Sequence, residues 1–327
     1  MKIDKSNMRQ TILEFPKQFR VGLQAAKNVK VEGKFDALLI SGMGGSALPG
    51  EILGIWLRSY KIGLPLYINR DYGLPDTVDE RSLLVFISYS GNTEEILTTF
   101  KEAQKKNLKI VAITSGGKLA KLCQKSKIPF ARIPKGFQPR MALGMQFAAL
   151  VKILVNCGII KNNLENILGL ENKLLPKELE LKGKNLAKKL KGKIPVIYAS
   201  DRLKSLAQIW KIKFNENSKT IALTNYFPEL NHNEITGFLN SQGKFQIIIL
   251  EDPSDHLRIL KRMKLTSKIL KSKGVIVQTI QIKGKDILDK TFSNLLLADW
   301  ASYYLALEKR LDPTPVKLQE EFKKRLK

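Results

Sequence analysis

Two short segments combine glycines with hydroxyl side chains where a strand is expected to pass into a helix. They are Ser41-Gly42-Met43-Gly44-Gly45-Ser46 and Ser88-Tyr89-Ser90-Gly91-Asn92-Thr93. Glycine lets the backbone approach a ligand closely, and the free N–H groups at a helix N-terminus attract an anion. Hydroxyls and turn N–H groups together suit the three oxygens of a phosphate monoester. We therefore expect these segments to bind phosphate.

The first segment alone leaves other interpretations open. Gly42, Gly44 and Ala47 satisfy the loose dinucleotide fingerprint, with the acidic Asp71 at the end of the next strand. A glycine turn that only packs a strand against a helix is a further interpretation. The second segment favours phosphate, because a plain helix cap at Thr93 or Asn92 would leave the other hydroxyls of the segment unexplained. Dinucleotide folds also need no second hydroxyl loop. The second segment also lacks the lysine of a nucleoside-triphosphate loop.

Candidates for acid–base chemistry are few. The chain has two histidines, His232 and His256. His256 stands at the start of an expected helix, where capping is the better interpretation, and His232 lies in a polar loop that is typical of a solvent-facing side chain. Glu216 lies between Asn215 and Asn217, which can hydrogen-bond a carboxylate without neutralising it. An exposed, solvated carboxylate is the alternative for Glu216.

The segments ISGMGGSALPGEIL and ISYSGNTEEIL resemble the sugar isomerase (SIS) fold. Within it, the chain is similar to the bifunctional phosphoglucose/phosphomannose isomerases, which carry two SIS domains in one short chain. The resemblance covers nearly the whole sequence and is weakest over 161–193. It implies that the phosphate of a sugar is bound by Gly45, Ser46, Ser88, Ser90 and Thr93.

The resemblance also implies catalytic roles. FNENSK resembles the segment that holds the catalytic base, which would be Glu216, and PELNHNE resembles the segment that holds the ring-opening histidine, which would be His232. His232 is expected to act in the partner's site, so the resemblance implies a homodimer. Arg140 matches the arginine that stabilises the enediolate, and Lys323 matches the family's lysine. The threonine linked to dual use of glucose and mannose substrates corresponds to Thr314.

The implied reaction interconverts glucose 6-phosphate and mannose 6-phosphate with fructose 6-phosphate through an enediol. Deprotonation at C2 erases the difference between the two aldoses, so one base can serve both. No hydride leaves the substrate, so we expect no cofactor. Two histidines 24 positions apart, two cysteines in apolar patterns and no His-Glu-x-x-His motif also predict no metal site.

The elements that must position these residues read as alternating short apolar strands and helices. Strands are expected at 37–41, 66–69, 83–88, 110–114 and 130–133, and again at 196–199, 221–225, 245–250 and 275–282. Unbroken Val, Ile and Leu runs between helices predict parallel sheets buried on both faces. We therefore predict an α/β protein with two doubly wound, phosphate-binding SIS-type domains. The expected divisions are 1–160, a helical linker at 161–193, and 194–327 with a C-terminal helical tail.

Composition adds limits on location. Hydrophobic residues make up 43% of the 327, and the apolar runs are strand-sized, far short of a membrane span. The charged N-terminus does not read as a signal peptide. Only Cys123 and Cys157 are present, which is typical of two inert thiols in a reducing compartment. We expect a cytoplasmic protein with no membrane association.

The formal net charge of +26 is unusual and comes mostly from lysine. A basic surface can bind nucleic acid by releasing counterions. No aromatic residues interleave with the lysine-rich stretches, so solvated helix faces that attract anionic metabolites are the favoured interpretation. The alternative function is a non-catalytic SIS regulator that senses sugar phosphates and binds nucleic acid. Only about 35 residues precede the first strand, which is short for a DNA-reading module.

Overall fold

The structure is a computed structural model that describes residues 3–162, 164–240 and 243–326. The chain forms two compact units, here called the N-terminal unit (Glu14–Leu174) and the C-terminal unit (Met1–Leu13 with Leu175–Lys327). Each holds a parallel sheet covered by helices, which confirms the predicted α/β class with two parallel-sheet domains. The division differs from the predicted boundaries, because the segment expected as a linker is shared between the two units and the first helix belongs with the second half of the chain.

The N-terminal unit is built on five parallel strands in the order β2-β1-β3-β4-β5. They are β1 (Ala37–Gly42), β2 (Leu66–Asn69), β3 (Ser82–Ile87), β4 (Lys109–Thr114) and β5 (Phe130–Arg132). The apolar runs of β1 and β3 are buried almost throughout, as expected for strands with helices on both faces. The chain passes from β1 to β2 on one side of β1 and then crosses to β3 on the other side, so the strand order reverses between β1 and β3. Ligands of open α/β sheets bind at such a switch point.

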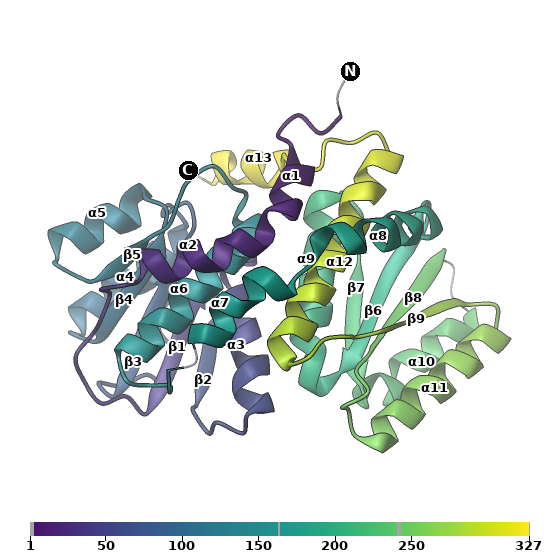
Figure 1. Ribbon diagram of the computed structural model, residues 1–327, viewed down its shortest axis with the longest axis horizontal. Helices are drawn as coiled ribbons and strands as arrows, with labels where there is room; N and C mark the ends of the chain where they lie inside the picture. The colour runs from purple at the N-terminus through teal and green to yellow at the C-terminus, as the bar shows by residue number, and fades with distance from the viewer. Residues whose placement is uncertain (1–2, 163, 241–242, 327) are drawn as a thin grey trace. The chain divides into compact units, whose positions relative to one another are not determined.

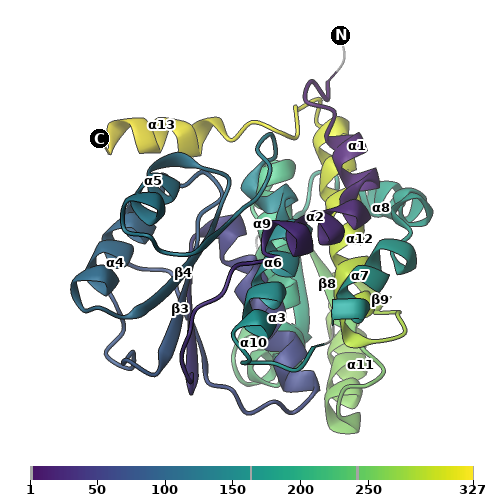
Figure 2. The same ribbon diagram turned by 60° about the vertical axis from the view of Figure 1, so that its left-hand side comes forward.

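Two helical layers enclose this sheet (Figure 1, Figure 2). The helices of the unit are α2 (Gln18–Ala25), α3 (Leu48–Ser59), α4 (Glu94–Lys105), α5 (Gly117–Lys125), α6 (Leu143–Asn156) and α7 (Leu164–Lys173). On one face α4 and α5 bury an apolar core that includes Phe86, Phe100 and Cys123. On the other face α3 and α6 pack together, and α2 packs against α6. The two layers hold the strand ends in fixed positions.

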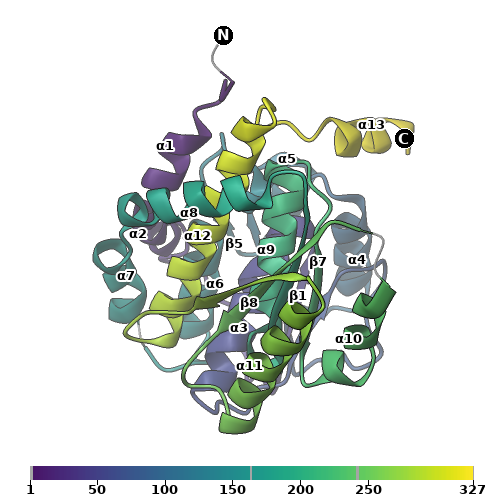
Figure 3. The same cartoon turned by 90° about the vertical axis from the view of Figure 1, so that its right-hand side faces the viewer.

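The C-terminal unit repeats the plan with four parallel strands in the order β7-β6-β8-β9. They are β6 (Ile194–Ser200), β7 (Leu223–Phe227), β8 (Phe245–Glu251) and β9 (Ile276–Gln281). The unit's helices are α1 (Met8–Leu13), α8 (Pro176–Leu190), α9 (Lys204–Asn217), α10 (Glu234–Gly237), α11 (Leu257–Ser272), α12 (Ile287–Glu308) and α13 (Lys317–Arg325). The short helix α10 and the longer helix α11 lie on one face of the sheet. Helix α9 lies on the other face, with α12 packed against it and α8 packed against α12 (Figure 1, Figure 3).

The N-terminal segment joins the C-terminal unit through buried polar groups. Asp4 accepts hydrogen bonds from the backbone N–H of Met8 at 2.8 Å and from the Tyr303 hydroxyl at 3.2 Å. Arg9 donates two hydrogen bonds to Glu180 of α8, at 2.7 and 2.8 Å. These contacts link α1 to α8 and α12, which explains why residues 1–13 do not belong with the unit that follows them in the sequence.

Glu180 gives a test of this attachment. Its hydrogen bond from Arg9, together with those from Tyr304 and Lys177, lowers the pKa of Glu180 from 4.5 to about 2. The unfolded chain therefore takes up a proton at higher pH than the folded chain, so the stabilisation is complete above the unfolded value of 4.5. It is lost as the pH falls from 4.5 toward about 2.

We predict that Glu180→Gln lowers the free energy of unfolding at neutral pH by about 2 kcal/mol, because Arg9 loses a charged partner. Urea unfolding as a function of pH is the measurement, and the variant should lose part of the acid sensitivity of the wild type below pH 4.5. Glu171→Gln is the control, because its partner Arg20 is largely exposed. Equal losses in both variants would contradict a special role for Glu180.

Candidate active site

The two glycine and serine loops lie side by side at the switch point of the N-terminal sheet. Ser41 and Gly42 at the end of β1 pair with Phe86 and Ile87 at the end of β3. The segments that follow therefore start from neighbouring strand ends, and each leads into a helix, α3 or α4. This is the crevice where open α/β sheets place ligands.

Hydroxyl groups and backbone N–H groups meet in the second loop. The Ser88 and Thr93 hydroxyl oxygens lie 2.9 Å apart, and Ser88 Oγ also accepts from Gly91 N at 3.2 Å. Thr93 is the N-cap residue of α4, but its side chain makes no capping hydrogen bond. Ser90 is exposed and accepts from Asn92 N at 3.3 Å. The first turn of α4 thus keeps N–H groups that the Thr93 side chain does not occupy.

The first loop and the segment that holds Arg140 approach each other at backbone distance. A Cβ atom built on Gly45 would lie 2.5 Å from Arg140 N, so only glycine fits there. Ser46 Oγ accepts from Tyr89 N at 3.1 Å. Arg140 is fully buried in the 3-10 helix Pro139–Met141. The structure therefore gathers five of the expected residues in one region of the N-terminal unit: Gly45, Ser46, Ser88, Thr93 and Arg140.

A third loop that the sequence analysis did not single out supports the second. Ser115, Gly116 and Gly117 follow β4, and Leu119 N donates to Gly91 O at 2.9 Å. A Cβ atom on Gly91 would lie 1.8 Å from Gly116 O. The signal in the sequence was a third run of hydroxyl and glycine residues after a strand, Thr114-Ser115-Gly116-Gly117.

The equivalent edge of the C-terminal sheet is filled by the chain's own charged groups. After β6 and β8, Arg202 donates to Asp252 at 2.6 Å and to Asp255 at 3.0 Å. Ser200 Oγ donates to Asp255 at 2.9 Å, and Lys290 donates to Asp252 at 2.8 Å. Two buried carboxylates at this place disfavour a second phosphate there, contrary to our expectation that both domains bind phosphate.

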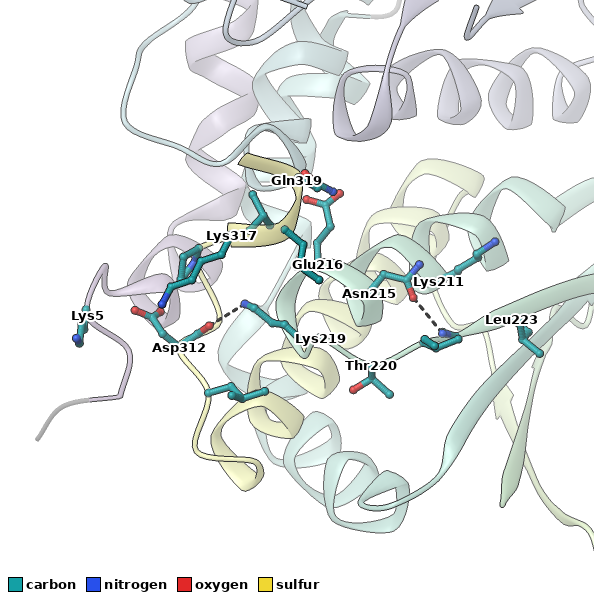
Figure 4. A pocket seen from close by; sticks show the side chains of 16 residues that line it. Lys5, Lys211, Asn215, Glu216, Lys219, Thr220, Leu223, Asp312, Lys317 and Gln319 are labelled. Carbon is teal, nitrogen blue, oxygen red and sulfur yellow. Dashed lines mark hydrogen bonds between the residues drawn. The ribbon is translucent and has the colours of Figure 1, made fainter. Parts of the chain in front are cut away.

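Glu216 lies on the wall of a cavity of about 920 Å³ in the C-terminal unit (Figure 4). The wall includes four lysines and the start of α13: Lys5, Lys211, Lys219, Lys317, Leu318 and Gln319. Lys219 Nζ donates to the backbone oxygens of Asp312 at 2.7 Å and Asn217 at 3.1 Å, which ties the C-terminal segment to the end of α9. A carboxylate among several ammonium groups suits an anionic substrate.

Buried polar contacts fix α9 against α12. They are the ion pair Lys213–Asp299 at 2.7 Å and the hydrogen bonds Trp210–Asn294 at 2.8 Å and Asn217–Ser302 at 2.9 Å. Such contacts oppose rotation of the helix about its axis, because each group would lose its partner in the interior. They therefore set the direction in which Glu216 leaves the helix. Asn215 instead accepts from Ala222 N at 3.0 Å.

His232 and Glu216 lie at opposite ends of one strand. Glu216 and Ala222 precede β7, whereas His232 follows it, exposed at the end of the 3-10 helix Glu229–His232. Five residues of extended chain separate the two ends by about 16 Å. Glu234 accepts hydrogen bonds from Tyr198 and Asn225, which anchors the loop of His232 at the carboxyl ends of β6 and β7.

The expected lysine lies away from the cavity wall. Lys323 is exposed on α13, a helix without buried residues, whereas Lys317 and Gln319 at the start of that helix line the cavity. Thr314 precedes α13 and donates its backbone N–H to Asp312 Oδ1 at 3.0 Å. The structure thus does not bring Lys323 to Glu216 within the C-terminal unit.

Residues suited to metal binding are dispersed. Over residues 3–162, 164–240 and 243–326, no three His, Cys, Asp or Glu side chains form a group that could hold a metal ion. Both cysteines are free thiols, and burial raises the pKa of Cys123 to about 12.

We predict that Gly91→Ala lowers the free energy of unfolding by at least about 2 kcal/mol, because a positive φ disfavours alanine and the methyl group meets Gly116 O. Gly44→Ala is the matched control: its φ is also positive, but a Cβ atom there has open space. Urea unfolding of both variants separates backbone strain from the close approach. Equal destabilisation would show that the contact with Gly116 contributes nothing.

Comparison with known proteins agrees with this geometry. Residues 36–150 match the family described as "SIS domain", and residues 180–326 match "Bacterial phospho-glucose isomerase C-terminal SIS domain". The chain is 38% identical over 336 residues to a bifunctional phosphoglucose/phosphomannose isomerase of Caldicellulosiruptor bescii, with 98% of each chain covered. It is 30% identical to a D-glucosamine-6-phosphate 4-epimerase of Sulfolobus acidocaldarius, with 87% of each covered.

The fold is shared more widely than the sequence. The C-terminal domain of glucosamine-fructose-6-phosphate aminotransferase from Francisella tularensis has a TM-score of 0.74 at 18% identity, with 96% of this chain and 100% of that chain covered. An identity this low shows the fold alone, whereas the full-length similarity to the bifunctional enzyme shows the family. The chain belongs to the family of bifunctional phosphoglucose/phosphomannose isomerases, with two SIS-type domains.

Proposed function

We propose that the protein interconverts glucose 6-phosphate and mannose 6-phosphate with fructose 6-phosphate through an enediol. The observation that carries the proposal is the cluster of the Ser88 and Thr93 hydroxyls at the start of α4, at the switch point of the N-terminal sheet. The cluster offers the hydrogen-bonding groups that a phosphate monoester needs. The isomerase that is similar to this chain over nearly its full length indicates the reaction class.

Phosphate binding is assigned to the loops of the N-terminal unit. Ser46, Ser88, Ser90 and Thr93 provide hydroxyls, and Gly45 allows the backbone to approach. Serine and threonine hydroxyls can turn to donate to a phosphate oxygen, because their rotors exchange partners easily. The phosphate is far from the reacting carbons, so this grip acts equally on substrate and transition state.

Proton transfer is assigned to Glu216. The carboxylate removes the proton from C2 of the open-chain aldose and returns it to C1 of the enediol, which gives the ketose. Arg140 stabilises the negative charge that develops on the enediolate oxygen. Every atom is conserved in the sugar, so no step is assigned to a redox cofactor or a metal.

One base can serve two aldoses. Glucose 6-phosphate and mannose 6-phosphate differ only at C2, and the enediol has no configuration there. Rotation about C2–C3 presents either face to Glu216 for return of the proton. The site must then hold the phosphate firmly and leave room around C2, which agrees with a grip built at the phosphate end.

Ring opening is assigned to His232 of a second copy of the chain. Within one C-terminal unit, Glu216 precedes β7 and His232 follows it, at opposite ends of a strand about 16 Å long, which supports the use of two chains for one site. His232 is exposed at its loop, as a residue must be if it serves a neighbouring protomer. The proposal therefore includes a homodimer whose sites each use both chains. Lys323 is kept in the proposal only as the lysine that the resemblance implies, because it is exposed on α13 and is not among the residues of the cavity wall.

A second candidate reaction comes from the relative named as a 4-epimerase. Epimerisation at C4 changes a centre that lies two bonds beyond C2, so it needs chemistry at another carbon. Assay of the wild-type protein with glucosamine 6-phosphate beside fructose 6-phosphate separates the two reactions. Its conversion, with no conversion of fructose 6-phosphate, would favour the epimerase.

Location and partners are further parts of the proposal. No helix in the described part of the chain is long and apolar enough to cross a membrane. Two free thiols, of which Cys123 is buried and Cys157 partly buried, suit a reducing compartment, so we propose a cytoplasmic location. The positive surface is assigned to attraction of phosphorylated sugars rather than to nucleic acid. A non-catalytic regulator would bind fructose 6-phosphate without turning it over.

We predict that Glu216→Gln lowers kcat about 10³-fold in both directions, because the amide cannot accept the C2 proton. Binding of fructose 6-phosphate, measured by calorimetry, should stay within about threefold of the wild type, since the phosphate grip is untouched. The exposed Glu165→Gln serves as the control and should keep wild-type turnover. Turnover retained by Glu216→Gln would remove Glu216 as the base.

We predict that inactive Glu216→Gln and His232→Ala variants restore activity when they are mixed and allowed to exchange subunits. In a mixed dimer with shared sites, one site carries both substitutions and the other carries neither. A one-to-one mixture should therefore regain about a quarter of wild-type activity, because half of the dimers are mixed. Mixing either variant with itself is the control. No recovery, with subunit exchange demonstrated by a tag, would show that each site uses one chain.

A further inference from the structure

Tyr89 stands between two of the expected phosphate ligands, Ser88 and Ser90, but its side chain is buried. Its hydroxyl donates to the backbone oxygen of Pro134 at 2.9 Å and accepts from the backbone N–H of Phe137 at 2.9 Å. Both partners lie in the short segment that connects β5 to the 3-10 helix of Arg140. One phenol group therefore fills two hydrogen-bonding positions of that segment.

The backbone of the same residue links two more loops. Tyr89 N donates to Ser46 Oγ at 3.1 Å, and Tyr89 O accepts from Ser115 N at 3.0 Å and from Ser115 Oγ at 2.7 Å. Tyr89 thus joins the segments that follow β1, β3, β4 and β5. These four strands end at the same edge of the sheet.

The segment that Tyr89 holds needs such support. Pro134, Lys135 and Gly136 are exposed, and Gly136 has a φ of +103°, so this stretch is a surface loop without regular structure. It leads directly to Arg140, which is fully buried. Burial raises the pKa of Tyr89, so the phenol keeps its proton and remains a donor to Pro134.

An ordinary buried tyrosine would also satisfy its hydroxyl group. Tyr303 is an example: it is equally buried, and its hydroxyl donates to Asp4, in the segment that attaches α1 to the C-terminal unit. The two tyrosines differ in where their hydrogen-bond partners lie in the chain. The phenol of Tyr89 contacts the segment that leads to Arg140, and its backbone N–H contacts Ser46 of the first loop.

We propose that Tyr89 is a positioning residue for Arg140, whose phenol holds the segment 134–140 on the phosphate-binding loop. The inference rests on the proposed function, in which Arg140 stabilises the enediolate. Through Tyr89, the part of the site that binds the phosphate also fixes where the guanidinium meets the reacting carbons. Loss of the hydroxyl should leave the phosphate grip in place and displace the arginine.

The test is Tyr89→Phe in the full-length protein, which removes one oxygen and keeps the ring. We expect kcat for fructose 6-phosphate to fall about tenfold, because a small displacement of a catalytic group costs that much or more. KM should change less than about twofold, since phosphate is bound in ground and transition states alike. Tyr303→Phe is the matched control and should keep the wild-type kcat.

A second measurement does not depend on turnover. Hydrogen exchange of the peptide that spans 134–141 should be faster in Tyr89→Phe than in the wild type, because Phe137 N loses its acceptor. The same peptide should be unchanged in Tyr303→Phe. Unchanged exchange in Tyr89→Phe would overturn the inference, because the phenol would then not hold the segment.

The outcomes separate this inference from the proposed function. A wild-type protein that converts none of the three sugar phosphates would refute the proposed function, and the role of Arg140 would fall with it. An active wild type with unchanged kcat in Tyr89→Phe would overturn the positioning role alone. A higher KM at constant kcat would also overturn it, because Tyr89 would then support phosphate binding only.

Discussion

Close approach of bare backbone at the edge of one sheet is the constraint on which the N-terminal unit depends. Gly91 lies against Gly116 O, and Gly45 lies against Arg140 N, at distances that exclude any side chain. These contacts draw the ends of β1, β3, β4 and the segment before α6 together. Hydroxyls of serine and threonine then crowd one helix start, where N–H groups already favour an anion. An arrangement of hydroxyl and N–H groups of this kind depends on backbone geometry and does not require a lysine.

The C-terminal unit has the same parallel-sheet plan but different side chains at its switch point. Its own switch point holds Arg202 between Asp252 and Asp255, so the position that we propose as the phosphate site in the first unit is closed by carboxylates in the second. In the proposed function this unit instead contributes residues from the two ends of β7: Glu216 before it and His232 after it. The buried Lys213–Asp299 pair holds the helix of Glu216, and Glu234 holds the loop of His232. The separation of the two ends explains why the proposed chemistry requires two copies of the chain.

Much of this was predictable from the sequence, because it depends on local signals. Glycine and hydroxyl runs after apolar strands indicate the loops that meet at the switch point without any knowledge of the fold. The bounds of strand β7 were harder to predict from the sequence: a strand was expected at 221–225, but the structure has it at Leu223–Phe227. Asn215 accepts a hydrogen bond from Ala222 N, so the chain is still a loop at Ala222. The strand continues instead through the polar Asn225 and Tyr226, which pair with β6.

Other features depend on partners far apart in the sequence and could not be predicted. The link from Arg9 to Glu180 spans most of the chain, and no local pattern places α1 with the second sheet. Tyr89 reads as an ordinary apolar position next to two serines, because its partners are more than forty residues away. The carboxylates at the second switch point were likewise hidden, since Asp252 and Asp255 read as a turn before a helix.

The most direct test of the central claim, transfer of a proton by one carboxylate, is isomerisation of fructose 6-phosphate in deuterium oxide. Proton magnetic resonance of the products reports whether C2 carries hydrogen from the solvent. We predict deuterium at C2 of both glucose 6-phosphate and mannose 6-phosphate, because the proton on Glu216 exchanges with water before it returns to the sugar. Turnover that leaves both aldoses free of deuterium would contradict the account that Glu216 holds a proton that exchanges with water during the reaction.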